Sequence, residues 1–181
     1  MSVSRRLLLR NGAALAGLSL AGLGQPGRAG ESDSRRIAFA NLHTGEHLDI
    51  EYFRHGEYLN EALQQIEKVL RDFRNGATHS MDPKLMDYLV EVAAKVGAKP
   101  AFSVISGYRS PETNEKLHDR SSGVSQHSLH MQGRAIDVRI AGVDCATLAA
   151  SALELKRGGV GYYRASNFVH LDTGAFRTWR G

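Results

Sequence analysis

Two strand-like stretches, 37–42 and 48–53, come early in the chain, and in the second one Leu48, Ile50 and Tyr52 alternate with polar residues. This alternation has the period of a strand with one buried face. The residues between them, 44–46, include Gly45 and are typical of a turn. The pattern therefore predicts a β-hairpin.

Helical periodicity follows the hairpin. Apolar residues recur every three or four positions over 58–75, which predicts a helix with one apolar face. A second helix begins at Asp82-Pro83, an N-cap followed by proline in the first turn, and ends at Gly97. A third is predicted over 144–155. These helices are interpreted as the scaffold of the core.

Short apolar runs at 102–106, 135–140 and 168–171 complete the pattern and predict strands. In the second run the apolar residues point one way, and Asp137 points the other way. We therefore expect a single α+β domain built on a small, mainly antiparallel sheet. Its helices are expected on one face, which leaves the other face for functional side chains.

The first 29 residues have the layout of an export signal. Arg5 and Arg6 resemble the twin-arginine signature, and the weakly apolar run that follows is too short for a membrane span. Small residues before Gly30 predict cleavage after Ala29, which leaves no membrane-spanning segment, and a retained amphipathic anchor is the alternative. The expected organisation is a signal peptide (1–29), a short linker (30–36) and one domain (37–181) in the periplasm.

The net charge of +4 lies in the leader. Four of the 23 basic residues fall in the first 29 positions, which contain no acidic residue, so 19 basic and 19 acidic residues remain in the rest of the chain. A neutral domain lacks the basic stripe of a nucleic-acid-binding protein. Cys145 is the only cysteine, which excludes an internal disulfide and a cysteine-rich metal site; it is interpreted as a small buried residue.

Three residues form the candidate metal site. His130 and Asp137 are separated by a loop that Gly133 allows to turn back, and His170 lies in the strand predicted at 168–171. If the two strands pair, the three side chains share one face of the sheet. Two histidines and one carboxylate leave a coordination position free, which is typical of a hydrolytic zinc centre and not of a structural one.

Arg109 is the candidate catalytic cation. It lies where a predicted strand passes through Gly107 into a helix that begins with Ser110 and Pro111. From this position a guanidinium can bind a substrate carboxylate or stabilise an oxyanion. The alternative is an arginine in a salt bridge at a helix N-terminus.

These motifs resemble a known family. The segments SGYRSP, SLHMQGRAID and FVHLDTG, with GGVGYY between the last two, are similar to zinc peptidases of bacterial cell walls. That group includes VanX-type D-alanyl-D-alanine dipeptidases, penicillin-insensitive murein endopeptidases and, structurally, hedgehog domains, and the closest likeness is to the murein endopeptidase K branch. The resemblance covers the chain after the leader. It implies one zinc ion on His130, Asp137 and His170, opposite the helices, and peptidoglycan stem peptides as substrate.

The resemblance also implies metal-assisted amide hydrolysis, with Arg109 steadying the oxyanion or a substrate carboxylate. Wider relatives often place a carboxylate three residues before the last ligand, where this chain has Asn167. Asp172 is therefore the first candidate for the general base and His127 the second. The alternative role of Asp172 is to orient His170, and both roles stay open.

Several alternatives remain at this stage. A non-haem iron oxygenase shares the ligand types, but its usual order, with a histidine after the His-x-Asp pair, is not found here. Two other functions stay open: a non-catalytic, zinc-containing wall-binding module, and a D,D- or L,D-carboxypeptidase that trims free stem peptides. The type of cross-link, 3-3 or 4-3, and the oligomeric state are also open. Tyr162 and Tyr163 are interpreted either as the lining of a groove or as a packed pair, and Trp179 as a plug at the C-terminus.

Overall fold

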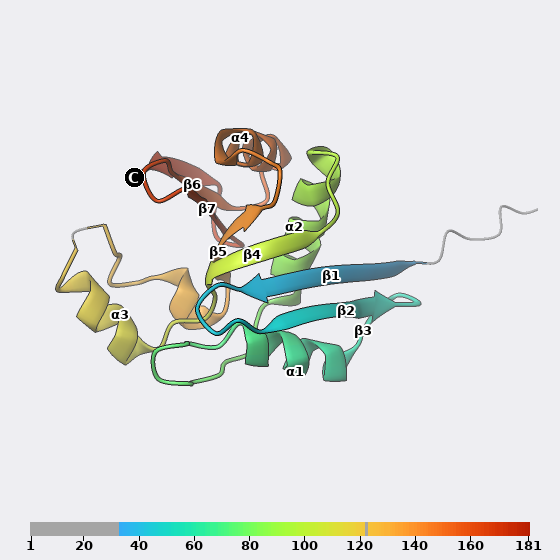
Figure 1. Cartoon of the computed structure of the whole chain (residues 1–181), viewed down its shortest axis with the longest axis horizontal. Coiled ribbons are helices and arrows are strands. Elements are labelled where there is room, and N and C mark those ends of the chain that lie inside the picture. The colour runs from blue at the N-terminus through green and yellow to red at the C-terminus, as the bar shows by residue number, and fades with distance from the viewer. Residues whose placement is uncertain (1–32, 122) are drawn as a thin grey trace, which may run out of the picture. The chain divides into compact units, whose positions relative to one another are not determined.

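In the part of the chain that the structure describes, one mixed sheet of eight strands carries the fold (Figure 1). The computed structural model describes residues 33–121 and 123–181, so the predicted leader and its cleavage after Ala29 lie outside the described residues. The elements, in chain order, are β1 (Ser34–Asn41), β2 (His47–Arg54), β3 (Glu57–Tyr58), α1 (Asn60–Val69), α2 (Pro83–Lys95), β4 (Ala101–Ser106), α3 (Pro111–His118), a 3₁₀ helix (Leu129–Gln132), β5 (Ala135–Ile140), α4 (Cys145–Leu155), β6 (Gly159–Tyr163), β7 (Phe168–Asp172) and β8 (Arg177–Arg180).

The strand order is β3-β2-β1-β4-β5-β7-β6-β8. Only two pairs, β1 with β4 and β6 with β8, are parallel, and the other five are antiparallel. This confirms the predicted α+β class with a mainly antiparallel sheet. The neighbouring interior strands β5 and β7 carry two of the candidate metal ligands, Asp137 and His170.

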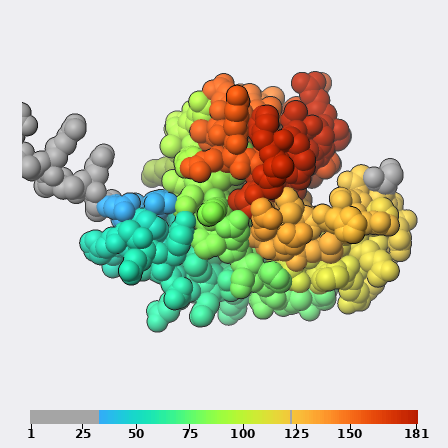
Figure 2. All heavy atoms as spheres, turned by 180° about the vertical axis from the view of Figure 1, so that it is seen from behind, coloured from blue at the N-terminus to red at the C-terminus, as the bar shows by residue number. Residues whose placement is uncertain are grey.

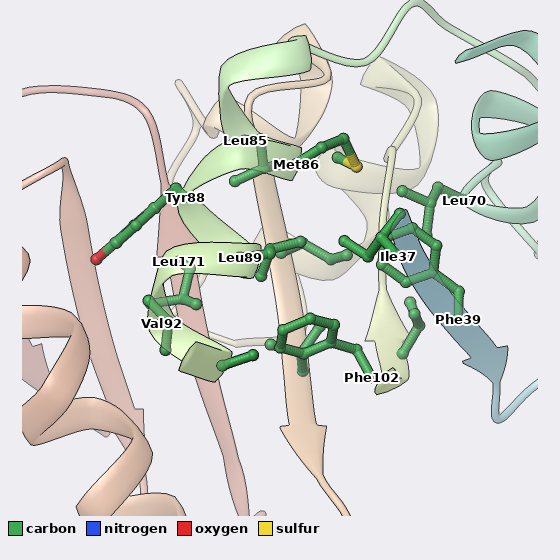
Figure 3. Packing of buried hydrophobic residues seen from close by; sticks show 14 of the residues in the cluster. Ile37, Phe39, Leu70, Leu85, Met86, Tyr88, Leu89, Val92, Phe102 and Leu171 are labelled. Carbon is green, nitrogen blue, oxygen red and sulfur yellow. The ribbon is translucent and has the colours of Figure 1, made fainter. Parts of the chain in front are cut away.

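The core lies between one face of the sheet and three of the helices. Helices α1, α2 and α4 all contribute buried apolar residues to the same cluster as the strands. In Figure 3, the side chain of Leu89 on α2 points toward those of Ile37 on β1 and Phe102 on β4, and all three belong to this cluster. Helix α3 contributes none of the core cluster, so the expectation that all helices pack on one face holds for α1, α2 and α4.

The hairpin is confirmed, with β1 beginning at Ser34, three residues earlier than predicted. The side-chain oxygen of Asn41 accepts hydrogen bonds from the backbone N–H groups of His43 and Thr44, which closes the turn. Gly45 follows with a φ of 72°, a conformation that glycine adopts without a steric cost.

The first helix is shorter than the predicted 58–75, because tertiary contacts take the carbonyl groups that would extend it. Asn41 Nδ2 donates to the carbonyl of Val69 (2.9 Å), and the N–H of Tyr108 donates to the carbonyl of Leu70 (2.7 Å). The chain then turns, and the N–H of Arg74 donates to the side chain of Asp72. Local periodicity carries no information about these long-range partners.

The other helix boundaries agree with their sequence signals. Asp82 and Asp144 cap α2 and α4 by accepting hydrogen bonds from backbone N–H groups, and Gly97 follows α2 with a φ of 67°. Cys145 is buried and free, as expected. Among the described residues no helix has the length and apolar character needed to cross a membrane.

Leu89 tests the packing between α2 and the sheet. It is fully buried in the core cluster, so Leu89→Ala leaves a cavity and should lower the free energy of unfolding by about 2–5 kcal/mol. Lys84→Ala on the exposed side of α2 is the control and should change it by less than about 0.5 kcal/mol. Urea unfolding of both variants measures the difference; equal effects would contradict the assigned packing.

Candidate active site

The candidate metal ligands meet on the face of the sheet opposite the core. β5 and β7 pair antiparallel with Asp137 directly opposite His170. Nδ1 of His170 lies 2.9 Å from Oδ1 of Asp137, and Nε2 of His130 lies 3.3 Å from that same oxygen. All three side chains are buried, and their ligand atoms lie within 4.8 Å of one another, so this set could hold one metal ion.

His130 reaches the site from the 3₁₀ helix that precedes β5. Ser128 caps this helix by accepting a hydrogen bond from the N–H of His130, and Gly133 ends it with a φ of 64°. A Cβ atom on Gly133 would overlap the carbonyl oxygen of Ser80, so a glycine is needed for space as well as for conformation. The segment that the sequence predicted as a loop is therefore a short 3₁₀ helix, and the predicted glycine turn ends it.

Hydrogen bonds behind the histidines determine which nitrogen faces the site. Nδ1 of His130 lies 2.7 Å from the carbonyl oxygen of Gly107, which can only accept, so Nδ1 is the donor and Nε2 is free for a metal. Nε2 of His170 lies 3.0 Å from Oδ2 of Asp172 and donates to it, which leaves Nδ1 free. Outer partners of this kind orient metal-binding histidines.

Asp172 is fully buried and surrounded by donors. Besides His170, it accepts hydrogen bonds from both terminal nitrogens of Arg177 (3.0 and 2.7 Å) and from the N–H groups of Gly159 and Gly174. Burial alone would raise the pKa of Asp172, but these hydrogen bonds outweigh it and hold the pKa well below its usual value. The carboxylate is therefore a charged, fixed partner of His170.

Arg109 is buried beside the three ligands. Its Nη2 lies 3.8 Å from Oδ2 of Asp137, its Nη1 donates to Asn114 (3.3 Å), and its Nε has no hydrogen-bond partner among the described residues. Burial lowers the pKa of the guanidinium, while the charge of Asp137 acts in the opposite direction. An arginine remains charged in proteins, so a buried positive charge with an unused donor adjoins the ligands.

The turn that carries Arg109 is held at both sides. The N–H of Arg109 donates to the carbonyl of His130 (3.2 Å), and the N–H of Ser110 donates to the buried carboxylate of Asp72 (3.0 Å). Ser110 then caps α3, as the sequence predicted. The guanidinium pairs with Asp137 in the site, so it is not a salt bridge of the helix N-terminus.

The ligands lie in a cleft of about 510 Å³. In Figure 2 the C-terminal segment, in red, and the yellow-orange segment around residue 125 flank a hollow. One wall is formed by Ser121 and by residues of the segment 123–130, and the other by residues of β6, β7 and β8. Such a cleft can admit an extended chain to the ligands.

The two base candidates lie in different environments. Asp172 is enclosed behind His170 and does not line the cleft, whereas His127 is exposed and does line it. Asn167 is exposed in the turn between β6 and β7 with a φ of 52°, and it is absent from the cleft lining. The geometry thus favours His127 over Asp172 as a group that can reach a water molecule in the cleft.

Two residues of the site, Arg177 and Asn114, had no role assigned from the sequence. Arg177 pairs with Asp172, and Asn114 joins Arg109 to the carbonyl of Ser125. Trp179, expected as a plug at the C-terminus, lines the cleft with its ring 5.1 Å from that of His170. The position of Trp179 in the cleft depends on the parallel pairing of β8 with β6, which no local sequence pattern predicts.

The fold and the site together define an α+β protein with residues for an open, three-ligand metal site. Residues 29–179 match the family described as peptidoglycan L,D-endopeptidase MepK, and the chain belongs to this family. The chain is 41% identical over 145 residues to the peptidoglycan L,D-endopeptidase MepK of Escherichia coli K12, covering 80% of each chain. It is also 41% identical over 148 residues to the probable peptidoglycan L,D-endopeptidase MepK of Haemophilus influenzae, covering 81% of this chain and 80% of the relative. No solved structure was found to match.

Gly133 offers a test of how His130 is positioned. Gly133→Ala should destabilise the protein by at least about 2 kcal/mol more than Gly142→Ala, because both glycines have a positive φ but only Gly133 lacks space for a Cβ atom. Urea unfolding compares the two variants. Equal losses would show that only the backbone conformation matters at Gly133.

Proposed function

We propose that the protein is a zinc-dependent endopeptidase that hydrolyses L,D-amide bonds in peptidoglycan cross-links. The observation that carries this proposal is the buried set of His130, Asp137 and His170 in an open cleft, beside the charge of Arg109. The names of the relatives supply the substrate class and the L,D designation. An L,D-amide is the bond of a 3-3 cross-link, whereas a 4-3 cross-link contains a D,D-amide.

The donor set supports zinc as the metal. Two neutral imidazole nitrogens and one carboxylate oxygen are common ligands of catalytic zinc, which keeps a fourth position for water or substrate. Burial lowers the pKa of His130, which keeps its imidazole neutral as a metal ligand requires. When bound, zinc supplies Lewis acidity that activates water near neutral pH and polarises a carbonyl group.

The protein residues have separate roles in this proposal. Arg109 stabilises the negative charge that develops on the carbonyl oxygen during attack, since its guanidinium is already desolvated beside the ligands. Asp172 and Gly107 orient the two histidines through their outer nitrogens. His127 accepts the proton of the attacking water and passes it to the leaving amine.

The proposed location follows from the substrate. Peptidoglycan lies outside the cytoplasmic membrane, and the proposed twin-arginine signal over 1–29 would deliver the domain to the periplasm. A wall-binding module without activity and a carboxypeptidase remain the competing functions, and the products of one assay distinguish all three.

The first test is hydrolysis. The domain from Gly30 onward should convert cross-linked muropeptide dimers with 3-3 links into monomers, should stop when a chelator removes the metal, and should recover with zinc. Chromatography with mass spectrometry follows the products. Loss of only a terminal residue from free stem peptides would indicate a carboxypeptidase, and bound zinc with intact dimers would indicate a binding module.

Asp172→Asn tests the orienting role. Loss of the charge next to His170 and Arg177 should weaken zinc affinity by roughly 10- to 100-fold, with activity largely restored by excess zinc. Asp144→Asn, at the exposed cap of α4, is the matched control and should bind zinc like the wild type. Unchanged zinc affinity together with lost activity would instead make Asp172 the base.

His127→Ala tests the base. It should lower kcat by about 100-fold or more with unchanged zinc affinity, because it removes the proton acceptor but no metal ligand. His47→Ala, an exposed histidine of the hairpin, is the control and should keep full activity. A fully active His127→Ala enzyme would rule out this assignment.

A further inference from the structure

The two adjacent tyrosines of β6 face opposite sides of the sheet. Tyr162 packs against the hydrophobic core, whereas Tyr163 lines the cleft. The sequence left both open as groove lining or as a packed pair, and the structure assigns each to a different environment. The ring of Tyr163 stacks on that of Phe168, with ring centroids 4.5 Å apart, which holds it on the cleft wall.

Trp179 holds the hydroxyl group of Tyr163 in place. β8 pairs parallel with β6 so that Trp179 lies opposite Gly161. A Cβ atom on Gly161 would lie within 2.6 Å of three atoms of the indole, so the glycine lets the ring lie directly on β6. From there Nε1 of Trp179 donates a hydrogen bond of 3.0 Å to the oxygen of Tyr163.

This contact leaves the phenol as a free donor. An indole N–H can only donate, so Tyr163 accepts from it and keeps its own hydrogen for another partner. No other described residue accepts that hydrogen, although the side chain lines the cleft. Accepting one hydrogen bond also polarises a hydroxyl group and strengthens the bond that it donates.

The charges of the cleft indicate what this donor meets. Arg109 and Arg177 line the cleft, while the described lining contains a single carboxylate, Asp137, which is a candidate metal ligand. Because arginine side chains outnumber carboxylates in this lining, the cleft favours an anionic group on the bound peptide. A hydroxyl donor on its wall is then suited to a carboxylate oxygen.

We propose that Tyr163, held by Trp179, binds a free carboxylate of the substrate peptide and so selects acidic peptides for the site. This inference rests on the proposed function and adds a specificity residue to it. Tyr163 takes no part in the proton transfers; it positions the peptide on the wall opposite the segment 123–130.

The matched pair Tyr163→Phe and Tyr162→Phe tests the proposal, since each removes one hydroxyl group from neighbouring positions of β6. On cross-linked muropeptides with free carboxylates, Tyr163→Phe should lower kcat/KM by roughly 10- to 100-fold, mainly by raising KM, as expected for one lost hydrogen bond to a charged group. Tyr162→Phe should keep the wild-type value. Thermal unfolding confirms that both variants are folded.

Amidated muropeptides identify the group that Tyr163 binds. If it binds a carboxylate, wild type and Tyr163→Phe should cleave a fully amidated substrate with the same kcat/KM. A persistent 10-fold difference on the amidated substrate would overturn the carboxylate assignment, and equal KM values on the free-acid substrate would overturn the role of Tyr163.

A failure of the proposed function is distinguishable from a failure of this inference. If the wild type cleaves no muropeptide, the endopeptidase assignment fails, and calorimetry then measures the Kd of the same free-acid muropeptides for wild type and Tyr163→Phe. A Kd raised roughly 10-fold or more in Tyr163→Phe supports the carboxylate contact, and an unchanged Kd overturns it.

Discussion

The pairing of β5 with β7 is the constraint on which the site depends. Its register places Asp137 opposite His170 on one face and Ile136 opposite Leu171 on the other, where the latter pair is fully buried. Because successive side chains alternate between faces, a shift of one residue in either strand would bury a candidate metal ligand in the core and expose an apolar residue. The packing of the core therefore fixes the register, and the register brings two of the three ligands together. The same two interior strands thus stabilise the fold and build the site.

The remaining site residues come from connections that the rest of the fold holds in place. The carbonyl of Leu70 accepts a hydrogen bond from the N–H of Tyr108, and the buried carboxylate of Asp72 accepts one from the N–H of Ser110. The segment after α1 therefore holds the turn that carries Arg109 in place. A Cβ atom on Gly107 would lie 2.9 Å from that of Leu70, which shows how closely the two segments approach. This close contact explains why α1 ends early: residues that could have extended a helix instead support the site.

The sequence predicted the parts of the protein that follow from local chemistry. The alternation over 135–140 placed Asp137 opposite the core, and the caps Asp82 and Asp144 fixed helix starts, because each signal lies within a few residues of the feature it determines. The end of α1, the strand β8 and the ion pair of Asp172 with Arg177 depend on partners that local periodicity does not encode. The residue types at 130, 137 and 170 predicted a ligand set, and the structure brings them together as that hypothesis required.

Asn167, three residues before the candidate ligand His170, is not suited to act as the general base. It occupies a left-handed conformation in the turn between β6 and β7, which asparagine tolerates better than most residues, and it is exposed outside the cleft lining. An amide also cannot take a proton from water under these conditions, so this position offers neither the chemistry nor the orientation of a base. The carboxylate of Asp172, with its oxygens occupied by five hydrogen bonds, is equally unsuited to the task. His127 lines the opposite wall of the cleft, and it is the proton acceptor that we propose.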